Sequence, residues 1–115
     1  MAEDFKKIFI ACGIDQKKFS KFFKAFGDPT RQKILAFLSI SDRTVTEIVD
    51  AIGYSQPTIS RHLSVLKNAD IVADRREGRS IYYSLNKDII RQCCVGFCDC
   101  LNVDAKPVRG KKKKK

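Results

Sequence analysis

Two short amphipathic helices are predicted over residues 45–66 with almost no chain between them, and this spacing constrains the fold more than any other feature. Thr44, which has a glutamate three residues later, or Thr46 can cap the first helix, and Gly53 ends it. After one intervening residue, Ser55 can cap the second helix. Two short helices joined by a tight, glycine-containing turn are typical of a helix-turn-helix.

A change from helical to alternating periodicity follows the second helix. Residues 71–75 and 81–85 are strand candidates, and residues 76–79 supply a glycine-containing hairpin tip. The remaining helices are predicted, with Asp15, Asp28 and Asn86 as N-caps of the last three, over residues 5–12, 16–26, 29–38 and 87–101. The expected fold class is mainly α with one β-hairpin wing, a winged helix-turn-helix of five or six helices in the order α-α-α-α-β-β-α.

Polar side chains cover the second helix of the motif opposite its apolar residues. Gln56, Ser60 and Arg61 lie in the first two turns, the part of a recognition helix that reaches base edges. Glutamine can pair with adenine and arginine with guanine, whereas serine is an adaptable donor or acceptor. The other predicted DNA contacts are Ser55 and Thr58 at phosphates, Ser64 and Lys67 further along the helix, and Arg75, Arg76 and Arg79 on the wing.

Most of the formal charge of +10 belongs to the C-terminal segment. Residues 105–115 contain seven basic and no acidic residues, which leaves 16 basic and 13 acidic residues, a net of +3, in residues 1–104. A basic segment of this kind is expected to be disordered and to attract any polyanion without reading its sequence. We therefore predict one winged-helix domain for DNA binding and dimerisation over residues 1–104, followed by a disordered basic tail over residues 105–115.

The first and last predicted helices have apolar faces that a chain of 115 residues can hardly cover by itself. These faces hold Phe5, Ile8 and Phe9 in the first helix and Ile90, Cys94, Phe97 and Leu101 in the last. Gly96 weakens the last helix by about 1 kcal/mol. We therefore expect a homodimer in which these faces are buried.

Several functional classes are excluded by what the sequence lacks. No apolar run approaches the roughly 18 residues that span a membrane, and the acidic start has no signal-peptide core, so a cytoplasmic protein without membrane contact is expected. A single histidine and the lack of a glycine-rich phosphate loop argue against an enzyme or an organic cofactor. That histidine, His62, lies at the edge of the predicted core, where a packing or hydrogen-bonding role is expected.

The segments that carry these predictions resemble the ArsR/SmtB family of repressors. The resemblance covers roughly residues 15–100 and is strongest in three segments, Ala25–Leu35 with its Asp-Pro-Thr-Arg sequence, Ser55–Ile71 and Arg75–Tyr83. It implies a homodimeric winged helix that represses transcription and releases operator DNA when an inducer binds.

Two departures from the family restrict where an inducer can bind. Members that sense through the helix before the recognition helix carry a Cys-x-Cys pair there, but residues 45–53 contain no cysteine. Members that bind zinc on the last helix use aspartate and histidine ligands, but no histidine follows His62. The inducer site is therefore expected among the C-terminal cysteines.

Four of the five cysteines lie within eight residues, at Cys93, Cys94, Cys98 and Cys100. In a reducing compartment such a cluster indicates a site for a soft, thiophilic ion. Cys94 and Cys98 share a helix face, whereas Cys93 and Cys94 diverge by about 100° in a regular helix. They can still converge on one ion at a helix end, and Gly96 lets the chain fold back afterwards.

Cys93, Cys94 and Cys100 form a Cys-Cys-x5-Cys pattern, which resembles the C-terminal arsenite site of some arsenic-responsive members. The resemblance implies As(III), or Sb(III), as the inducer, bound by three thiolates, with Cys98 as an extra thiol. Four sulfurs could instead hold Cd(II), Pb(II) or Zn(II).

Other interpretations of the cysteines stay open at this point. A redox sensor could form a disulfide or persulfide from neighbouring thiols. A constitutive nucleic-acid-binding protein could use the cysteines to hold a structural zinc ion. Cys94, and Cys12 in the first helix, could also be small core residues without a ligand, because free cysteine is often buried.

Overall fold

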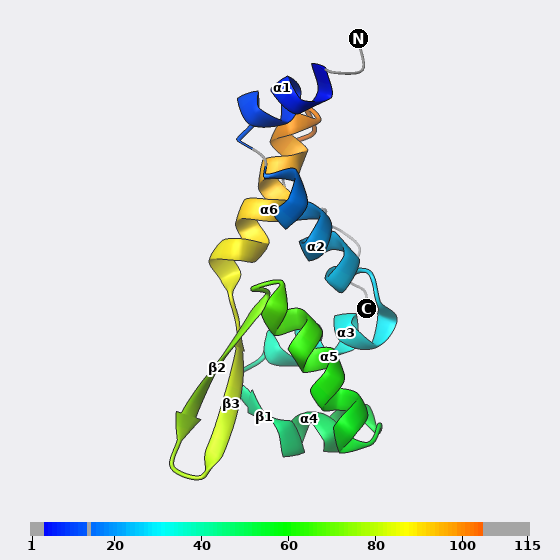
Figure 1. Cartoon of the computed structure of the whole chain (residues 1–115). Helices are drawn as coiled ribbons and strands as arrows, with labels where there is room; N and C mark the ends of the chain where they lie inside the picture. The colour runs from blue at the N-terminus through cyan, green and yellow to red at the C-terminus, as the bar shows by residue number, and fades with distance from the viewer. Residues whose placement is uncertain (1–3, 14, 105–115) are drawn as a thin grey trace, which may run out of the picture.

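The computed structural model describes residues 4–13 and 15–104 and has the predicted winged helix-turn-helix architecture. The elements are α1 (Asp4–Ala11), α2 (Gln16–Phe26), α3 (Pro29–Leu38), β1 (Arg43–Thr44), α4 (Val45–Ile52), α5 (Gln56–Asn68), β2 (Val72–Glu77), β3 (Ser80–Leu85) and α6 (Lys87–Cys100). Figure 1 shows that α4, the start of α5 and the tip of the wing lie at one end of the elongated molecule. The helix α1 and the end of α6 lie at the other end.

Each of the helices α2 to α6 begins at an N-cap residue, whose side chain accepts a hydrogen bond from the backbone N–H group three residues later. All five caps agree with the sequence predictions: Asp15, Asp28, Thr44, Ser55 and Asn86. Thr44, rather than Thr46, caps α4, because Glu47 completes a capping box by accepting from the backbone N–H of Thr44 at 2.9 Å.

The strands of the wing are longer than the sequence predicts. β2 and β3 pair antiparallel as far as Glu77 opposite Ser80, so half of the predicted tip belongs to the strands. The turn consists of Gly78 and Arg79, and Gly78 has the left-handed φ of 64° that a two-residue hairpin favours. The strand β1 pairs with β3 to give the order β1-β3-β2. Its two residues are too few to show an alternation, which is why the sequence does not predict it.

The core lies between the helices and the base of the wing. It consists of the inward faces of α2 to α5, the residues that lead into β2, and one residue of α6: Phe19, Phe22, Ala25, Ile34, Leu35, Leu38, Ile48, Ile59, Leu63, Leu66, Ala69, Ile71, Val72 and Cys93. Full burial of a large apolar side chain contributes roughly 1.5–3 kcal/mol. The three core residues that α5 supplies therefore hold this helix firmly against α2, α3 and α4.

The buried face of α6 differs from the predicted one by one residue. Cys93 is fully buried, whereas Cys94 is half-buried. The physical reason is the close approach of α2, since a Cβ at Gly96 would lie 3.7 Å from the ring of Phe19. The face with Cys93 and Gly96 therefore turns toward α2. The helix continues through this glycine, so the chain does not fold back as the sequence analysis expects.

Apolar side chains are exposed on α1 and after the end of α6. Phe5, Ile8 and Ile10 on α1 and Leu101 after α6 are between 49% and 70% exposed. Cys12, at the end of α1, is also exposed and is therefore not a core residue. Within the described ranges, none of the helices is long and apolar enough to cross a lipid bilayer. The end of the molecule opposite the wing thus carries an apolar surface.

Candidate nucleic-acid interface and thiol sites

The helix α5 has two different faces, as its sequence predicts. Three apolar residues anchor it in the core, and they fix its rotation about its own axis. The residues predicted to contact DNA are exposed or half-exposed: Ser55, Gln56, Thr58, Ser60, Arg61, Ser64 and Lys67. Because the rotation of the helix is fixed, the position of this polar surface is fixed as well.

A polar groove lies between the start of α4, the start of α5 and the wing. Its volume is about 390 Å³, and it is lined by Thr44, Val45, Thr46, Gln56, Arg79, Ser80 and Ile81. Two helix N-termini and an arginine of the wing thus meet at one groove. Free backbone N–H groups at a helix N-terminus attract anions, and arginine binds phosphate oxygens. The groove therefore suits a DNA phosphate.

The two hydroxyls predicted to meet phosphate interact with each other at the start of α5. The hydroxyl of Ser55 donates to Oγ1 of Thr58 at 3.0 Å and accepts from the backbone N–H of Thr58 at 3.4 Å. This arrangement orders the first turn of the helix before any ligand is present. A phosphate at this position would meet a helix N-terminus whose cap is already in place.

The arginines predicted on the wing differ in their environment. Arg75 forms ion pairs with the carboxylates of Glu77 and Asp42. Hydrogen bonds to Glu77 and then to Asp42 raise the pKa of Arg75 above its usual value. Arg76 and Arg79, close to the turn, are exposed. Arg75 therefore holds the wing to the loop before β1, whereas Arg76 and Arg79 are placed to reach a ligand.

Lys67, near the end of α5, is also engaged in an ion pair. Its Nζ lies 2.9 Å from Oδ2 of Asp74 on β2. The hydrogen bond to Asp74 raises the pKa of Lys67. This contact joins α5 to the base of the wing, so the two elements predicted to bind DNA are positioned relative to each other.

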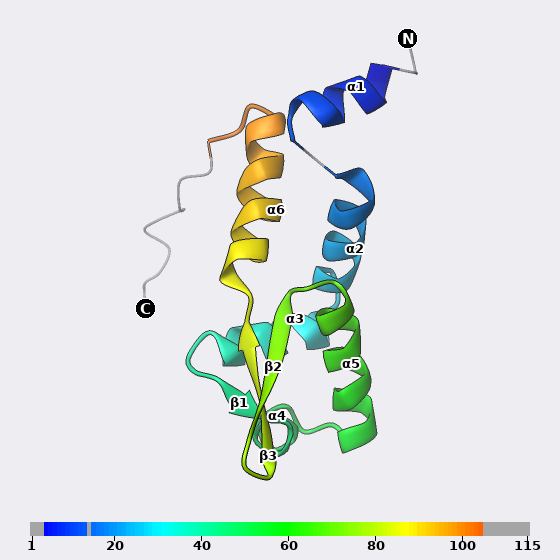
Figure 2. The same cartoon turned by 60° about the vertical axis from the view of Figure 1, so that its left-hand side comes forward.

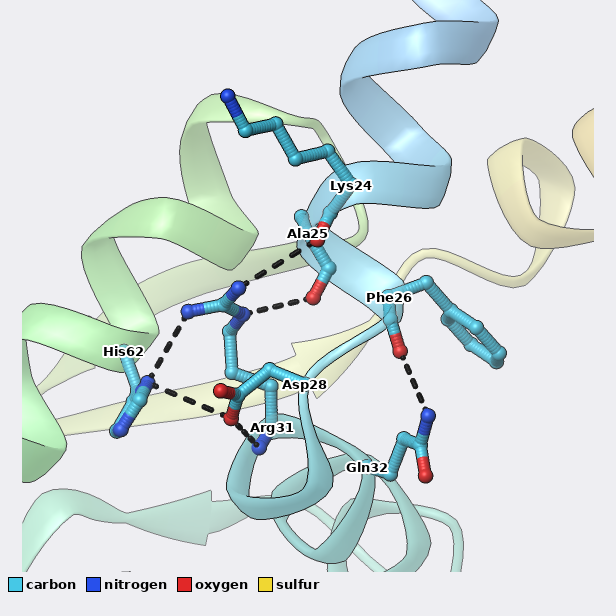
Figure 3. Close-up of polar contacts among 7 residues, drawn as sticks. All are labelled: Lys24, Ala25, Phe26, Asp28, Arg31, Gln32 and His62. Atoms are coloured by element: carbon cyan, nitrogen blue, oxygen red, sulfur yellow. Dashed lines mark hydrogen bonds and ion pairs between the residues drawn. The ribbon is translucent and has the colours of Figure 1, made fainter.

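A further contact holds α5 from its other side, through His62 (Figure 3). Nε of Arg31 donates to the carbonyl of Ala25 at 2.7 Å, Nη1 lies 3.2 Å from Nδ1 of His62, and Nη2 donates to the carbonyl of Lys24 at 3.5 Å. Arginine has no acceptor, so this hydrogen bond requires the tautomer in which Nδ1 of His62 is the acceptor. The expected hydrogen-bonding role of His62 is therefore confirmed.

Asp28 completes this cluster. Its carboxylate accepts from the backbone N–H of Arg31 at 3.0 Å and lies 4.0 Å from Nδ1 of His62. The hydrogen bond from Arg31 is the main reason that the pKa of Asp28 is below its usual value. Sequence reasoning identifies Asp28 as a cap but does not predict the contacts of Arg31. The signal that could have indicated them is the Asp-Pro-Thr-Arg segment, which ends at Arg31. The cluster joins the end of α2 and the start of α3 to α5.

The helix α6 distributes its cysteines over two faces. Cys93 and Cys100 lie within about 20° of each other around the helix axis, whereas Cys94 and Cys98 lie one turn apart on another face. Cys93 is buried and the other three are half-buried. In residues 4–13 and 15–104, no three His, Cys, Asp or Glu side chains are grouped closely enough to hold a metal ion. The intact helix therefore does not bring Cys93, Cys94 and Cys100 together.

The neighbour of the Cys100 thiol is Cys12, for which sequence reasoning favoured a core position and left open a contribution to the ion site. A hydrogen bond with Cys12 is the main reason that the pKa of Cys100 is raised. Burial raises the pKa of Cys93 and of Cys94, and Cys98 raises that of Cys94 further. Because only the thiolate binds soft ions, these three groups must lose protons before they can act as ligands.

Comparison with known proteins finds a matching family model and similar proteins among bacterial regulators. A family model described as "Bacterial regulatory protein, arsR family" matches residues 28–74, from the cap of α3 into β2. The chain is 46% identical over 80 residues to the transcriptional repressor SdpR of Bacillus subtilis (strain 168), covering 70% of this chain and 89% of that protein. It is 44% identical over 85 residues to the probable mercury resistance operon repressor of Streptomyces lividans, covering 74% of this chain and 67% of that protein.

A solved structure shows the same fold. The chain is similar to the solution NMR structure of the homodimeric winged helix-turn-helix DNA-binding domain of a possible ArsR-family transcriptional regulator from Mycobacterium bovis. The TM-score is 0.63 at 29% sequence identity, and the alignment covers 75% of this chain and 81% of that chain. The similarity thus extends over most of both chains.

Proposed function

The chain belongs to the arsR family of bacterial regulatory proteins, whose members are DNA-binding regulators and not enzymes, and from this premise we propose that it is a transcriptional repressor that binds operator DNA as a homodimer. We propose further that As(III), or Sb(III), induces release of the operator by binding thiolates of α6. The observation that carries the second part is the cluster of four cysteines on this helix.

The proposed DNA contacts follow from the two faces of α5 and from the groove beside it. Gln56, Ser60 and Arg61 read base edges, and Ser64 lies on the same exposed surface. Ser55, Thr58 and the start of α4 meet phosphates, with Arg76 and Arg79 of the wing on the adjacent backbone. Lys67 and Arg75 take part through the ion pairs that position α5 and the wing.

The exposed apolar residues at the far end of the molecule support the proposed homodimer. Phe5, Ile8 and Ile10 of α1 and Leu101 after α6 form a surface that a second copy of the chain can cover. The structural relative from Mycobacterium bovis is homodimeric. A two-fold dimer would present two recognition helices to half-sites about one helical turn apart. Sedimentation velocity at micromolar concentration tests this directly, and a monomer would contradict it.

The positions of the α6 thiols suggest how an inducer would act. Cys93 points into the core and Cys100 neighbours α1, so three thiolates can surround one As(III) only if the end of α6 changes its conformation. Since α6 belongs to the proposed dimer interface, this change would alter the spacing of the two recognition helices. A coupling of about 1–3 kcal/mol between two sites is typical and corresponds to a five- to 150-fold loss of operator affinity.

Operator binding in the presence of soft ions tests the proposal. The DNA is a duplex that the protein itself selects from a random library, and As(III), Sb(III), Cd(II), Pb(II), Zn(II) and Hg(II) are titrated separately. We expect As(III) to release the DNA with uptake of one ion per site and release of protons, and less effectively at acid pH. The double variant Cys93→Ser/Cys94→Ser should lose the response, whereas Cys12→Ser, the matched control outside α6, should retain it.

Two outcomes would change the proposal. An As(III) response that persists in Cys93→Ser/Cys94→Ser would exclude the α6 thiols as the inducer site. A response to Cd(II), Pb(II), Zn(II) or Hg(II) without one to As(III) would keep the site and change the ion. The similarity to a probable mercury resistance operon repressor is the reason for including Hg(II). The single variant Cys98→Ser decides whether this thiol is an alternative or a fourth ligand.

The division of the chain and its place of action belong to the same proposal. Residues 1–104 form the DNA-binding and dimerisation domain, and residues 105–115 act as a basic tail that attracts DNA without reading its sequence. The tail lies outside the described residues. A repressor of this kind acts in the cytoplasm, where operator DNA is found and where thiols stay reduced.

A further inference from the structure

A second groove lies between α2 and the end of α5. Figure 2 shows these two helices along one side of the molecule, with α6 on the other side. The groove has a volume of about 330 Å³ and is lined by Lys21, Lys24, Ala25, Arg31, Val65 and Asn68. Asn68 is the last residue of α5, so the groove lies at the opposite end of this helix from Gln56, which is proposed to read bases.

The rim of this groove is positively charged and has no matching carboxylate. Lys21 and Lys24 are exposed on α2. In residues 4–13 and 15–104, neither lysine forms an ion pair, and Arg31 forms none either. The carboxylate of Asp28 accepts from the backbone N–H of Arg31 and not from its guanidinium. Three cations therefore face one groove without a partner of opposite charge.

The guanidinium of Arg31 has donors to spare. It lies between the end of α2 and α5 and makes three contacts, with the carbonyls of Ala25 and Lys24 and with His62 (Figure 3). A guanidinium carries five N–H groups, so two are left without an acceptor among the described residues. The residue is half-buried, and a partly desolvated cation with free donors favours an anionic ligand.

The base of the groove is apolar. Ala25 of α2 is buried and Val65 of α5 is half-buried, and both line the groove. The volume is near the lower end of the range of roughly 300–1,000 Å³ that is typical of small-molecule sites. An inorganic anion would leave this apolar surface uncovered, and so would the sugar-phosphate backbone of DNA. The groove therefore suits a ligand that has both an acidic group and an apolar body.

We propose that this groove binds a small organic carboxylate whose apolar body is about the size of a benzene ring. The planar carboxylate pairs with the fork of Arg31, Lys24 supplies a second cation at the rim, and the apolar body covers Ala25 and Val65. The lining residues belong to α2, α3 and α5, and the exposed apolar surface of α1 and the end of α6 contributes none. This inference goes beyond the proposed function and depends neither on As(III) nor on operator DNA.

The test is a titration of the full, ¹⁵N-labelled chain with sodium benzoate at constant ionic strength and without DNA, followed by NMR. We expect saturable shifts of the backbone amides of Ala25 and Val65 and of the side-chain amide of Asn68, with a Kd of about 1 mM or tighter. Benzamide has the same shape without the charge, and inorganic phosphate has charge without an apolar body. Each should bind at least about tenfold more weakly than benzoate.

Two variants and one control place the ligand in the groove. Lys24→Glu should weaken benzoate binding about tenfold or more, because it reverses a charge at the rim. Lys17→Glu is the matched control, since Lys17 is exposed on the same helix but does not line this groove, and it should change the Kd less than about threefold. Arg31→Lys keeps the charge but loses the fork, so it should also weaken binding. Lys24→Glu changes an exposed residue and decides the question even if Arg31→Lys is poorly folded.

Several results would overturn the proposal. One is the absence of saturable shifts up to about 10 mM benzoate. Another is equal binding of benzamide or phosphate, which would exclude recognition of an apolar carboxylate. Equal weakening by Lys17→Glu and Lys24→Glu would show attraction by net charge alone. A hexaglutamate peptide that shifts the same amides at lower concentration than benzoate would assign the groove to an acidic protein segment instead.

Discussion

The guanidinium of Arg31 lies 3.2 Å from Nδ1 of His62, and this contact joins the start of α3 to the recognition helix. The same guanidinium donates to the carbonyl of Ala25 at the end of α2. Three elements, α2, α3 and α5, therefore meet at one side chain. Because α2 also packs against α6, Arg31 is placed to hold the tilt of α5 relative to the proposed dimer surface.

Replacement of Arg31 by lysine should weaken both stability and DNA binding. Lysine has no planar fork, so it cannot reach His62 and the carbonyls of α2 together. We expect the free energy of unfolding in urea to fall by roughly 1–2 kcal/mol and the operator affinity to fall several-fold. Lys33→Ala is the matched control, since Lys33 is exposed on the same helix and its loss should cost under about 0.5 kcal/mol. Equal behaviour of the two variants would contradict the role of Arg31.

The lowered pKa of Asp28 predicts a specific loss of stability in acid. A carboxyl whose pKa is lower in the folded state than in the unfolded state stabilises the fold when the pH is above its usual pKa of 3.8. This stabilisation is lost as the pH falls below 3.8 and through the folded pKa. Asp28→Asn keeps a capping side chain but should flatten this acid dependence, whereas Asp28→Ala should also cost about 1 kcal/mol at neutral pH. Urea unfolding from neutral pH down to about pH 2, below the usual pKa of the carboxyl, measures both effects.

The division of DNA contacts predicts different effects for α5 and for the tail. Arg61→Ala should reduce discrimination between the preferred base and other bases by about 1–3 kcal/mol. Removal of residues 111–115 should weaken binding evenly across sequences and flatten its salt dependence. Competition with a library of operator variants at several salt concentrations separates the two effects. A tail deletion that changes sequence preference, with no change in Arg61→Ala, would reverse the assignment.

The close approach of α2 and α6 makes Gly96 a sensitive position. A Cβ at this residue would lie 3.7 Å from the ring of Phe19, which is an ordinary contact distance. Gly96→Ala should therefore stabilise the protein by roughly 0.5–1 kcal/mol, because alanine favours the helix. Gly53→Ala is the control, since Gly53 has a φ of 94° and the same change should destabilise there. A destabilised Gly96→Ala variant would show that α2 and α6 pack more tightly than described.

Most of the fold follows from local signals in the sequence. Asp15, Asp28, Thr44, Ser55 and Asn86 mark their helices because a capping oxygen and the next backbone N–H groups are close in sequence. The element β1 is different, because its pairing with β3 depends on residues about 40 positions away. The rotation of α6 is also set at long range, by the ring of an α2 residue.

The candidate sites also combine features that follow from local sequence with features that depend on distant residues. The exposed residues of α5 follow from helical periodicity, since each apolar anchor fixes the direction of its neighbours. The ion pairs of Lys67 and Arg75 and the contact between Arg31 and His62 join residues that are distant in sequence, so periodicity does not show them. Cys12 and Cys100 are even further apart in the sequence, and their proximity depends on how the end of α1 is placed beside the end of α6.

The measurement that tests the central claim most directly is the affinity of As(III) for the free dimer and for the operator-bound dimer. Linkage requires that As(III) lower operator affinity by the same factor by which the operator lowers As(III) affinity. We predict that the two factors agree and lie between about five and 150, and that both disappear in Cys93→Ser/Cys94→Ser. Equal As(III) affinity of the free and DNA-bound dimers would contradict the account.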